Sequence, residues 1–374
     1  MNVSIIAGRY YHSKDGIGRY TTTLVKELKL LDKNLQLNVI SDTFQSPSIN
    51  SKKNPITPFI PDIIKSYINP IKNEFHYYSR FRNNKFSMLN ELKDINSQVY
   101  HAISPSESIM PIKLYKKPLI TTFHDIIPLV SESRYKFEKY YFNTYSSYAK
   151  KSQLLLAVST KTKEDLINVL GISENKILVI YPGIDTNKFY PLQRKSSNTK
   201  IILFLGGLTK RKGIYETIYA FNKLAKKRND VRLIIGGDGD EFFKLNQIIH
   251  KLNLNKFVHF LGFIDERQLL SYYHRADLFV YPSKYEGFGF TPLEAMASGV
   301  PVITSSSSSL SEIVGDAAIK VDPYDINEIC LQMNKILDNN NLQNILIKKG
   351  INQSRKFSWK RCAKETLDAY KSVL

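Results

Sequence analysis

Short apolar runs typical of buried strands alternate with amphipathic helical segments, and this alternation constrains the fold more than any other feature. The runs fall into two series on either side of the polar segment "DTNKFYPLQRKSSNTK", which has the composition of a linker. Strands that alternate with helices favour parallel sheets. The sequence therefore predicts an α/β fold with two Rossmann-like domains, at residues 1–187 and 198–355. The expected strands are VSIIAG, LQLNVIS, QVYHAIS, LITTFHD, LLLAVS and ILVIYPG in the first series, and KIILFLGG, VRLIIGGDG, VHFLGF, DLFVYPS, PVITS and AAIKVD in the second.

The length and composition agree with this organisation. A chain of 374 residues is long enough for two domains, and 43% hydrophobic with 23% charged residues is typical of a globular protein. No run of about 20 apolar residues could span a bilayer, and the start "MNVSIIAG" does not resemble a signal peptide, so a cytoplasmic location is expected. Cys330 and Cys362 lack the spacing of metal ligands and are expected to be free thiols.

The net charge of +19 is spread evenly, with +9 in residues 1–187 and +10 in the remainder. A nucleic-acid-binding domain more often concentrates its charge, so nucleic acid is not an expected partner. An anionic membrane surface, such as the cytoplasmic face of an inner membrane, is the better candidate. Segments 66–89 and 134–151 interleave aromatic and basic side chains, as an interfacial surface would. The alternative, aromatic side chains in a core and charges in solvent, is slightly favoured for the second segment.

The stretch "YPSKYEGFGFTPLEAMASGVPVITSSSSS" (residues 281–309) predicts a strand, a glycine turn, a helix and a second strand. Thr291 would cap the helix, with Glu294 at the third helical position, and Gly299 would end it. Turn N–H groups and the positive helix end would then face an anionic ligand beyond the strand. Carboxylates accept from hydroxyls, so Glu286 and Glu294 suggest a ligand with phosphate and sugar parts. Alternatively, Glu294 is only a cap and Glu286 only a solvated charge.

The whole stretch resembles the signature of glycosyltransferase family 4, in which two glutamates separated by seven residues flank such a turn. The resemblance extends over nearly the whole chain and implies the GT-B fold, two Rossmann-like domains facing each other across a cleft, with a final helix at about 356–374 that crosses back to complete the first domain. The family implies that Glu286 acts at the donor sugar and Glu294 at the ribose. The donor-binding residues implied in the turn are Gly287, Phe288, Gly289 and Phe290.

Two further glycine-containing motifs match the family. In "KDGIGRYTTTLVKELKL" Gly16 and Gly18 are expected in a loop before a helix, where the family implies approach to the donor diphosphate, with Arg19 a candidate acceptor contact. In "LFLGGLTKRKG" the family implies diphosphate binding by Arg211 and Lys212, with Gly207 at a position where many members have Arg. The alternative for this motif is a basic loop in a basic protein.

Three other segments lie near the expected site. In "TTFHDIIPL" His124 follows a strand and resembles a family histidine beside the donor sugar, and Asp125 is a candidate acceptor contact. In "GGDGDEFF" Asp238 and Asp240 are explained better by a turn than by a metal, and no metal or other cofactor is expected. The run "SSSSSL" (residues 305–310) is expected to be a flexible loop.

The resemblance implies a retaining hexosyltransferase. GDP-mannose is favoured over UDP-sugars as the donor, and a lipid-linked or polysaccharide glycan is the expected acceptor. One rival is a hydrolysing sugar-nucleotide epimerase, which shares the architecture, and another is a non-catalytic partner in glycan synthesis. A dinucleotide-dependent oxidoreductase is disfavoured because no strand is followed by a full G-x-G-x-x-G motif. The sequence does not predict an oligomeric state.

Overall fold

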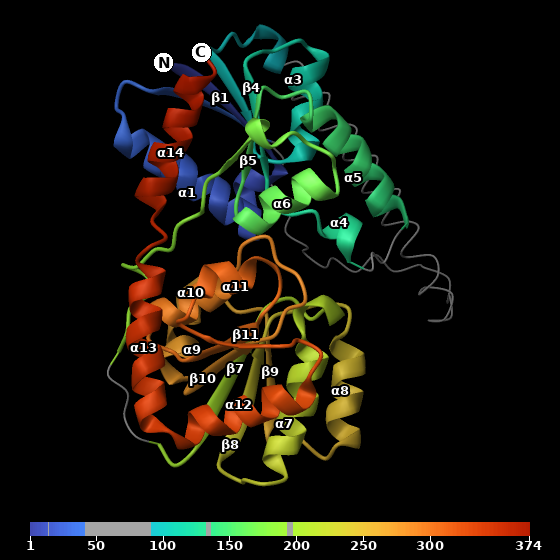
Figure 1. The fold of residues 1–374 in the computed structure, drawn as a ribbon, viewed down its shortest axis with the longest axis vertical. Helices are drawn as coiled ribbons and strands as arrows, with labels where there is room; N and C mark the ends of the chain where they lie inside the picture. Colours follow the sequence, from blue (N-terminus) through green and yellow to red (C-terminus); the bar gives the residue numbers. More distant parts are fainter. Residues whose placement is uncertain (14, 42–90, 132–135, 193–196) are drawn as a thin grey trace, which may run out of the picture. The chain divides into compact units, whose positions relative to one another are not determined.

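The chain forms two six-stranded parallel sheets, as the alternation predicts (Figure 1). The structure is a computed structural model that describes residues 1–13, 15–41, 91–131, 136–192 and 197–374. The segment 66–89, with its proposed interfacial surface, lies outside the described residues. Every expected strand is present, so the predicted α/β class is confirmed.

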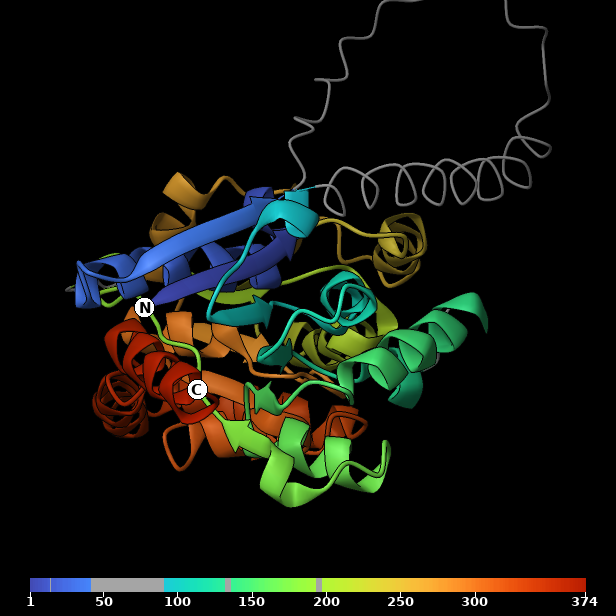
Figure 2. The same ribbon diagram turned by 90° about the horizontal axis from the view of Figure 1, so that it is seen from above.

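The first sheet has the strand order β2-β1-β3-β4-β5-β6. Strands β1 and β2 run side by side and are coloured blue in Figure 2. Alternation of strand and helix brings β1 into parallel pairing with both β2 and β3. The strands are β1 (Asn2–Gly8), β2 (Gln36–Ser41), β3 (Val99–Ala102), β4 (Leu119–Phe123), β5 (Leu154–Ala157) and β6 (Ile177–Val179).

The second sheet has the strand order β12-β11-β10-β7-β8-β9. When these strands are renumbered from one, this is the 3-2-1-4-5-6 order of dinucleotide-binding folds. The order reverses between β7 and β10, and ligands of open parallel sheets bind beyond the carboxyl ends of the strands at such a reversal. The strands are β7 (Lys200–Leu205), β8 (Val231–Gly236), β9 (Val258–Gly262), β10 (Leu278–Tyr281), β11 (Val302–Ser305) and β12 (Ile319–Val321).

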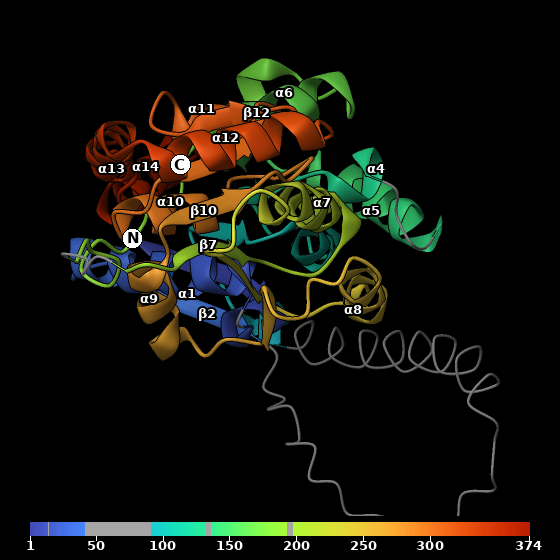
Figure 3. The same cartoon turned by 90° about the horizontal axis from the view of Figure 1, so that it is seen from below.

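Helices between the strands bury the apolar faces of the sheets. In the second sheet's layer, α7 and α12 pack side by side (Figure 3) and both contact β10. Short 3-10 turns η1 (Arg9–His12), η2 (Pro105–Ser108) and η4 (Lys210–Lys212) precede helices, and η3 (Glu174–Lys176) precedes β6. The helices are α1 (Gly16–Leu31), α3 (Ile109–Lys113), α4 (Ile127–Val130), α5 (Lys136–Ala149), α6 (Thr160–Asn168), α7 (Ile214–Ala225), α8 (Phe242–Lys251), α9 (Glu266–Arg275), α10 (Phe290–Ala297), α11 (Ser308–Val314), α12 (Ile326–Asp338), α13 (Asn340–Ser354) and α14 (Trp359–Ser372).

Contacts divide the chain into two compact units. Unit 1 comprises Met1–Thr122, Tyr145–Leu154 and Tyr370–Leu374, and unit 2 comprises Phe123–Thr144 and Leu155–Ala369. The domain boundaries at residues 187 and 198 remain a prediction. In the parts of the chain that the structure describes, no helix is both long and apolar enough to cross a bilayer.

The basic and aromatic segment 134–151 largely becomes α5. Tyr140 on this helix is 66% exposed, whereas Ser146 and Ala149 are buried. The favoured alternative, a core position for the aromatic side chains, is therefore wrong for Tyr140.

The end of α14 joins the core of unit 1 through a buried histidine. His101 on β3 is 0% exposed, and its ring nitrogens lie 2.7 Å from the hydroxyls of Tyr370 and Thr122. Tyr370 is also 0% exposed. The hydrogen bond between Tyr370 and His101 attaches the last residues of the chain to the first sheet.

We expect Tyr370→Phe to lower the free energy of unfolding by about 1–2 kcal/mol, because a buried ring nitrogen loses its partner while the packing volume is kept. Urea denaturation followed by circular dichroism measures the change. Tyr115→Phe is the matched control, since Tyr115 is 86% exposed. An equal loss in the two variants would contradict the role of the buried bond.

Candidate active site

Two loops at the reversal of the second sheet hold the candidate site, both in unit 2. One follows β7 and contains Arg211 and Lys212, and the other follows β10 and contains Glu286. The tight turn after β7 depends on Gly213, which has a φ of 73° and is the N-cap of α7. The strand order therefore brings together cationic and anionic residues about 75 positions apart in the sequence.

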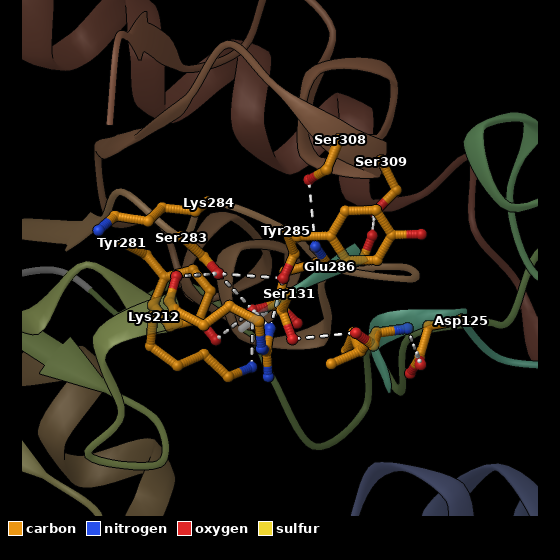
Figure 4. A network of polar contacts seen from close by, with 12 residues as sticks. Asp125, Ser131, Lys212, Tyr281, Ser283, Lys284, Tyr285, Glu286, Ser308 and Ser309 are labelled. Atoms are coloured by element: carbon orange, nitrogen blue, oxygen red, sulfur yellow. Dashed lines mark hydrogen bonds and ion pairs between the residues drawn. The ribbon is translucent and has the colours of Figure 1, made fainter. Parts of the chain in front are cut away.

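Glu286 is 9% exposed and is surrounded by donors (Figure 4). Its Oε1 accepts hydrogen bonds from Lys212 Nζ at 2.6 Å and from Arg211 Nη1 at 3.1 Å. The hydroxyls of Ser283 and Tyr281 donate to the same oxygen at 2.6 and 3.0 Å. Within the described chain no donor reaches Oε2. One carboxylate oxygen thus anchors the side chain, and the other can accept from a ligand hydroxyl.

The charges in this group shift one another's pKa values. Burial alone would raise the pKa of Glu286, but the charges of Lys212 and Arg211 outweigh it and leave the pKa below its ordinary value. Burial lowers the pKa of Lys212, against the opposing charge of Glu286. Burial also raises the pKa of the Tyr281 hydroxyl, which keeps its proton and donates to Glu286. The 2.6 Å distance between Lys212 Nζ and Glu286 Oε1 is that of a charge-assisted hydrogen bond.

We expect ligand binding at this site to have a bell-shaped pH dependence. Below the ordinary Glu286 pKa of 4.5, protonation of the carboxylate removes the ion pair, and binding falls as pH drops. On the alkaline side, Lys212 loses its charge below its ordinary pKa of 10.5, because its folded-state pKa is lowered. The affinity for a nucleoside diphosphate, measured by calorimetry from about pH 3 to 10, tests both limbs.

Lys212→Arg should move the alkaline limb of this profile to higher pH, because an arginine stays charged across the range. Titration of the ligand itself affects both proteins equally. An alkaline limb at the same pH in the two proteins would rule out Lys212 as its cause.

The serine run holds the turn instead of forming the expected flexible loop. Ser305 ends β11, and α11 begins at Ser308. Ser309 Oγ donates to the carbonyl oxygens of Glu286 and Phe288, both at 2.9 Å, and the N–H of Glu286 donates to Ser308 Oγ at 3.2 Å (Figure 4). The prediction of a flexible loop is therefore wrong. These hydroxyls pair with main-chain groups that a buried turn would otherwise leave without partners.

The glycines of the turn serve its packing. A Cβ on Gly287 would lie 1.7 Å from the carbonyl oxygen of His124, and one on Gly289 would lie 2.6 Å from Leu310 Cδ2. Gly289 has a φ of 116°, which few other residues adopt. Protein atoms therefore occupy the space that a Cβ on either glycine would need.

Helix α10 begins two residues earlier than expected. Its N-cap is Gly289, no side chain caps it, and Thr291 is helical, so the predicted capping box is absent. Gly299 has the predicted left-handed conformation after the helix, with a φ of 72°. Glu294 is 0% exposed and accepts a hydrogen bond from Tyr273 OH at 2.9 Å. Neither alternative sequence interpretation holds, because Glu294 is no cap and Glu286 is no solvated charge.

The aromatic residues of the motif pack in the protein. Phe288 is 5% exposed, and its ring centroid lies 5.1 Å from that of Phe290 and 5.6 Å from that of Phe357. Phe290 stacks on Trp359 at 6.2 Å. Any contact of Phe288 with a ligand would therefore involve its main chain.

His124 and Asp125 follow β4 and adjoin the turn. The carbonyl oxygen of His124 lies against Gly287. Asp125 Oδ1 accepts from the N–H of Ile127 at 2.9 Å. Removal from water raises the pKa of Asp125, although this hydrogen bond and the charge of Arg211 oppose the shift. The structure thus brings Asp125 within electrostatic range of the ion pair.

Gly16, Gly18 and Arg19 lie in unit 1, within the first turn of α1 and not in a loop as expected. The N–H of Gly18 donates to the Oδ1 of Asp15, the N-cap, at 2.8 Å. A Cβ on Gly18 would lie 2.0 Å from the carbonyl oxygen of Ser13, which gives this glycine a structural reason.

Two further positions that the sequence singled out are Gly207 and Asp238. Gly207 is exposed, and the nearest atom to a Cβ added there is 3.8 Å away. Asp238 Oδ1 accepts from the N–H of Gly239 at 2.7 Å, after β8. Within the described ranges, no three His, Cys, Asp or Glu side chains are grouped so that they could hold a metal ion.

Family comparisons match adjoining parts of the chain. The model for Glycosyltransferase Family 4 matches residues 14–188, and the model for Glycosyl transferases group 1 matches residues 186–353. The chain belongs to glycosyltransferase family 4. Like the enzymes of this family, it is a retaining glycosyltransferase that transfers a sugar from a nucleotide sugar.

Individual relatives agree with this assignment. O-antigen chain mannosyltransferase B of Escherichia coli is 27% identical in an alignment of 390 positions that covers 95% of this chain and 96% of that protein. The fold is similar to that of sucrose-phosphate synthase from Thermosynechococcus elongatus, with a TM-score of 0.75 at 19% identity over 100% and 98% of the two chains. It is also similar to Anabaena HepE in complex with UDP and glucose, with a TM-score of 0.74 at 17% identity over both full chains. The predicted GT-B fold is confirmed.

The sequence interpretation missed most of the residues that hold this glycosyltransferase turn. Tyr281, Ser283 and Tyr285 lie inside the quoted motif, but nothing in it predicted that their side chains would bond Glu286 or distant residues. The serine run at residues 305–310 was predicted to be a flexible loop and not part of the turn. A dense run of hydroxyls beside a buried turn is the signal that could have indicated them.

Proposed function

We propose that this glycosyltransferase moves mannose from GDP-mannose to a lipid-linked or polysaccharide glycan. The observation that carries the proposal of a donor site is the group of Glu286, Arg211 and Lys212 at the reversal of the second sheet. The preference for mannose rests on the motif resemblance and on the similarity to the Escherichia coli mannosyltransferase over 95% of the chain.

In this proposal Arg211 and Lys212 bind the donor diphosphate. The bonds of the Arg211 side chain within the described chain all use Nη1, so Nη2 and Nε can donate to phosphate oxygens. Lys212 Nζ adds a second fixed charge. As the bond between sugar and phosphate breaks, negative charge grows on the leaving diphosphate, and these cations stabilise it.

Glu286 acts on the sugar. Its free Oε2 accepts a sugar hydroxyl, and its charge favours the positive character that develops at the anomeric carbon. The acceptor hydroxyl attacks from the face that the leaving group occupies, and a leaving phosphate oxygen receives its proton. The configuration at the anomeric carbon is thereby retained.

Glu294 binds the ribose hydroxyls in this proposal. Because Glu294 is fully buried without ligand, ribose contact requires displacement of the groups that cover it. Glu294→Gln then weakens the binding of nucleotide and sugar nucleotide alike, whereas an effect on folding alone would lower the melting temperature without changing affinity per folded molecule.

The remaining positions are assigned by resemblance. His124 positions the sugar, and Gly16, Gly18, Gly207 and the main chain of Gly287 to Phe290 approach the donor. Asp125 and Arg19 are proposed to contact the acceptor. The exposed Tyr140 on α5 is compatible with peripheral binding to an anionic cytoplasmic membrane face, where aromatic side chains are common.

The first experiment is a thermal-shift screen with GDP-mannose, UDP-glucose, UDP-N-acetylglucosamine, GDP and UDP, with Glu294→Ala in parallel. Stabilisation by the guanosine ligands alone, lost in the variant, supports the proposal. Stabilisation by uridine ligands instead would overturn the choice of GDP-mannose. A turnover assay with the donor that binds then separates the rivals. Consumption of donor without acceptor would favour an epimerase, and binding without turnover would favour a non-catalytic partner.

A further inference from the structure

Tyr285 connects the donor turn to helix α6, which none of the motifs predicted. Its hydroxyl donates to Asp165 Oδ2 at 2.5 Å. Asp165 is 5% exposed, and its Oδ1 accepts from Lys161 Nζ at 2.6 Å, so each carboxylate oxygen has a donor. Burial and the Asp165 carboxylate raise the pKa of Tyr285, which therefore keeps its proton. The far end of the Tyr285 side chain is thus anchored to a buried, charge-compensated group.

The main chain of Tyr285 holds Arg211. The Tyr285 carbonyl oxygen accepts from Arg211 Nη1, which also donates to Glu286 Oε1 at 3.1 Å. Throughout the described ranges these two oxygens are the acceptors of the Arg211 side chain. The direction of its remaining N–H groups therefore depends on where the Tyr285 peptide lies.

Helix α6 is itself attached to the same turn. The hydroxyls of Ser159 and Thr162 donate to the Gly287 carbonyl oxygen at 2.7 and 3.3 Å. Glu312 on α11 accepts from the N–H groups of Thr160 and Lys161 at 3.2 and 3.1 Å. The first turn of α6 is consequently a fixed support behind the donor loop, and Asp165 lies in the next turn of the same helix.

We propose that Tyr285 and Asp165 are positioning residues that hold Arg211 in the geometry required to bind the donor diphosphate. This inference rests on the proposed function of Arg211. Neither residue contacts the reacting atoms; each acts through the Tyr285 peptide. Displacement of a binding group by about 1 Å can reduce catalysis by about 100-fold, so the effect of a support can be large.

The test is a double-mutant cycle on nucleotide affinity with the full chain, using GDP and UDP as probes in calorimetry. Tyr285→Phe keeps the ring and removes only the hydroxyl, and it should weaken binding of the preferred nucleotide by roughly 5- to 10-fold. In an Arg211→Ala background the same change should have an effect of less than about 2-fold, because the group being positioned is gone.

Two further variants separate positioning from general stability. Asp165→Asn keeps an oxygen that accepts from Tyr285, so its nucleotide affinity should stay within about 3-fold of the wild type. Asp165→Ala should weaken nucleotide binding as much as Tyr285→Phe does. Tyr181→Phe is the matched control. It removes a phenol that also donates to a carboxylate near α6, Glu312 at 3.2 Å, but does not touch Arg211, and affinity should stay unchanged.

The outcomes distinguish this inference from the function on which it rests. If the wild type binds neither GDP nor UDP, both proposals fail. If the wild type binds and Tyr285→Phe weakens binding equally in both backgrounds, or not at all, only the positioning role is overturned. Non-additivity with rescue by Asp165→Asn supports it.

Discussion

Glu286→Gln should reduce the rate of sugar transfer by roughly 100- to 1,000-fold, the range seen when one group that stabilises transition-state charge is removed. The amide keeps the size of the side chain but removes the charge that pairs with Lys212 and Arg211. It also removes the negative charge proposed to favour the developing positive centre on the sugar. The measurement is the initial rate of nucleotide release from GDP-mannose with a mannan oligosaccharide acceptor.

The matched control is Glu241→Gln, which replaces a carboxylate bonded to Tyr215 and near Lys244 outside the donor loops. Its rate should change by less than about 3-fold. A Glu286→Gln protein that folds and retains a comparable rate would exclude the role given to this carboxylate.

Gly287→Ala should lower the free energy of unfolding by about 2–4 kcal/mol. The added Cβ would lie 1.7 Å from the His124 carbonyl oxygen, which is main chain and cannot rotate away. Movement of Gly287 in the other direction is opposed by the hydrogen bond between its own carbonyl oxygen and Ser159 Oγ at 2.7 Å. Either the loop after β4 or the donor turn must shift, and urea denaturation measures the cost.

Gly207→Ala provides the comparison for this substitution, because the nearest atom to its new Cβ lies 3.8 Å away. Its free energy of unfolding should stay within about 1 kcal/mol of the wild type. Equal destabilisation of the two variants would mean that the contact with His124 is not the cause.

Local patterns predicted much of this protein. The strands were found because buried strands are short apolar runs bounded by turn residues, and that signal lies within each segment. Gly299 was predicted to be left-handed for the same kind of local reason. The motifs also identified Glu286, Arg211 and Lys212, although nothing local showed that one carboxylate oxygen would accept from both cations.

Other features were misread because one local pattern fits several structures. Five consecutive serines suit a flexible loop, yet here the hydroxyls of Ser305, Ser308 and Ser309 pair with carbonyl and N–H groups of a buried turn. Glycines in a turn suit a ligand site, yet Gly287 is needed because the backbone at His124 occupies the space of a Cβ. The N-cap of α10 is Gly289 instead of Thr291, because Gly289 adopts a conformation closed to most residues.

The sequence by itself therefore determined the strands, the α/β class and the residues of the proposed donor site. Only the tertiary structure decided which of them meet. The reversal between β7 and β10 joins Arg211 to Glu286, and Asp165 and Tyr285 pair although 120 residues separate them. The physical reason is that periodicity and turn chemistry act within a few residues, whereas contacts between distant loops depend on strand order, burial and the pairing of every polar group they enclose.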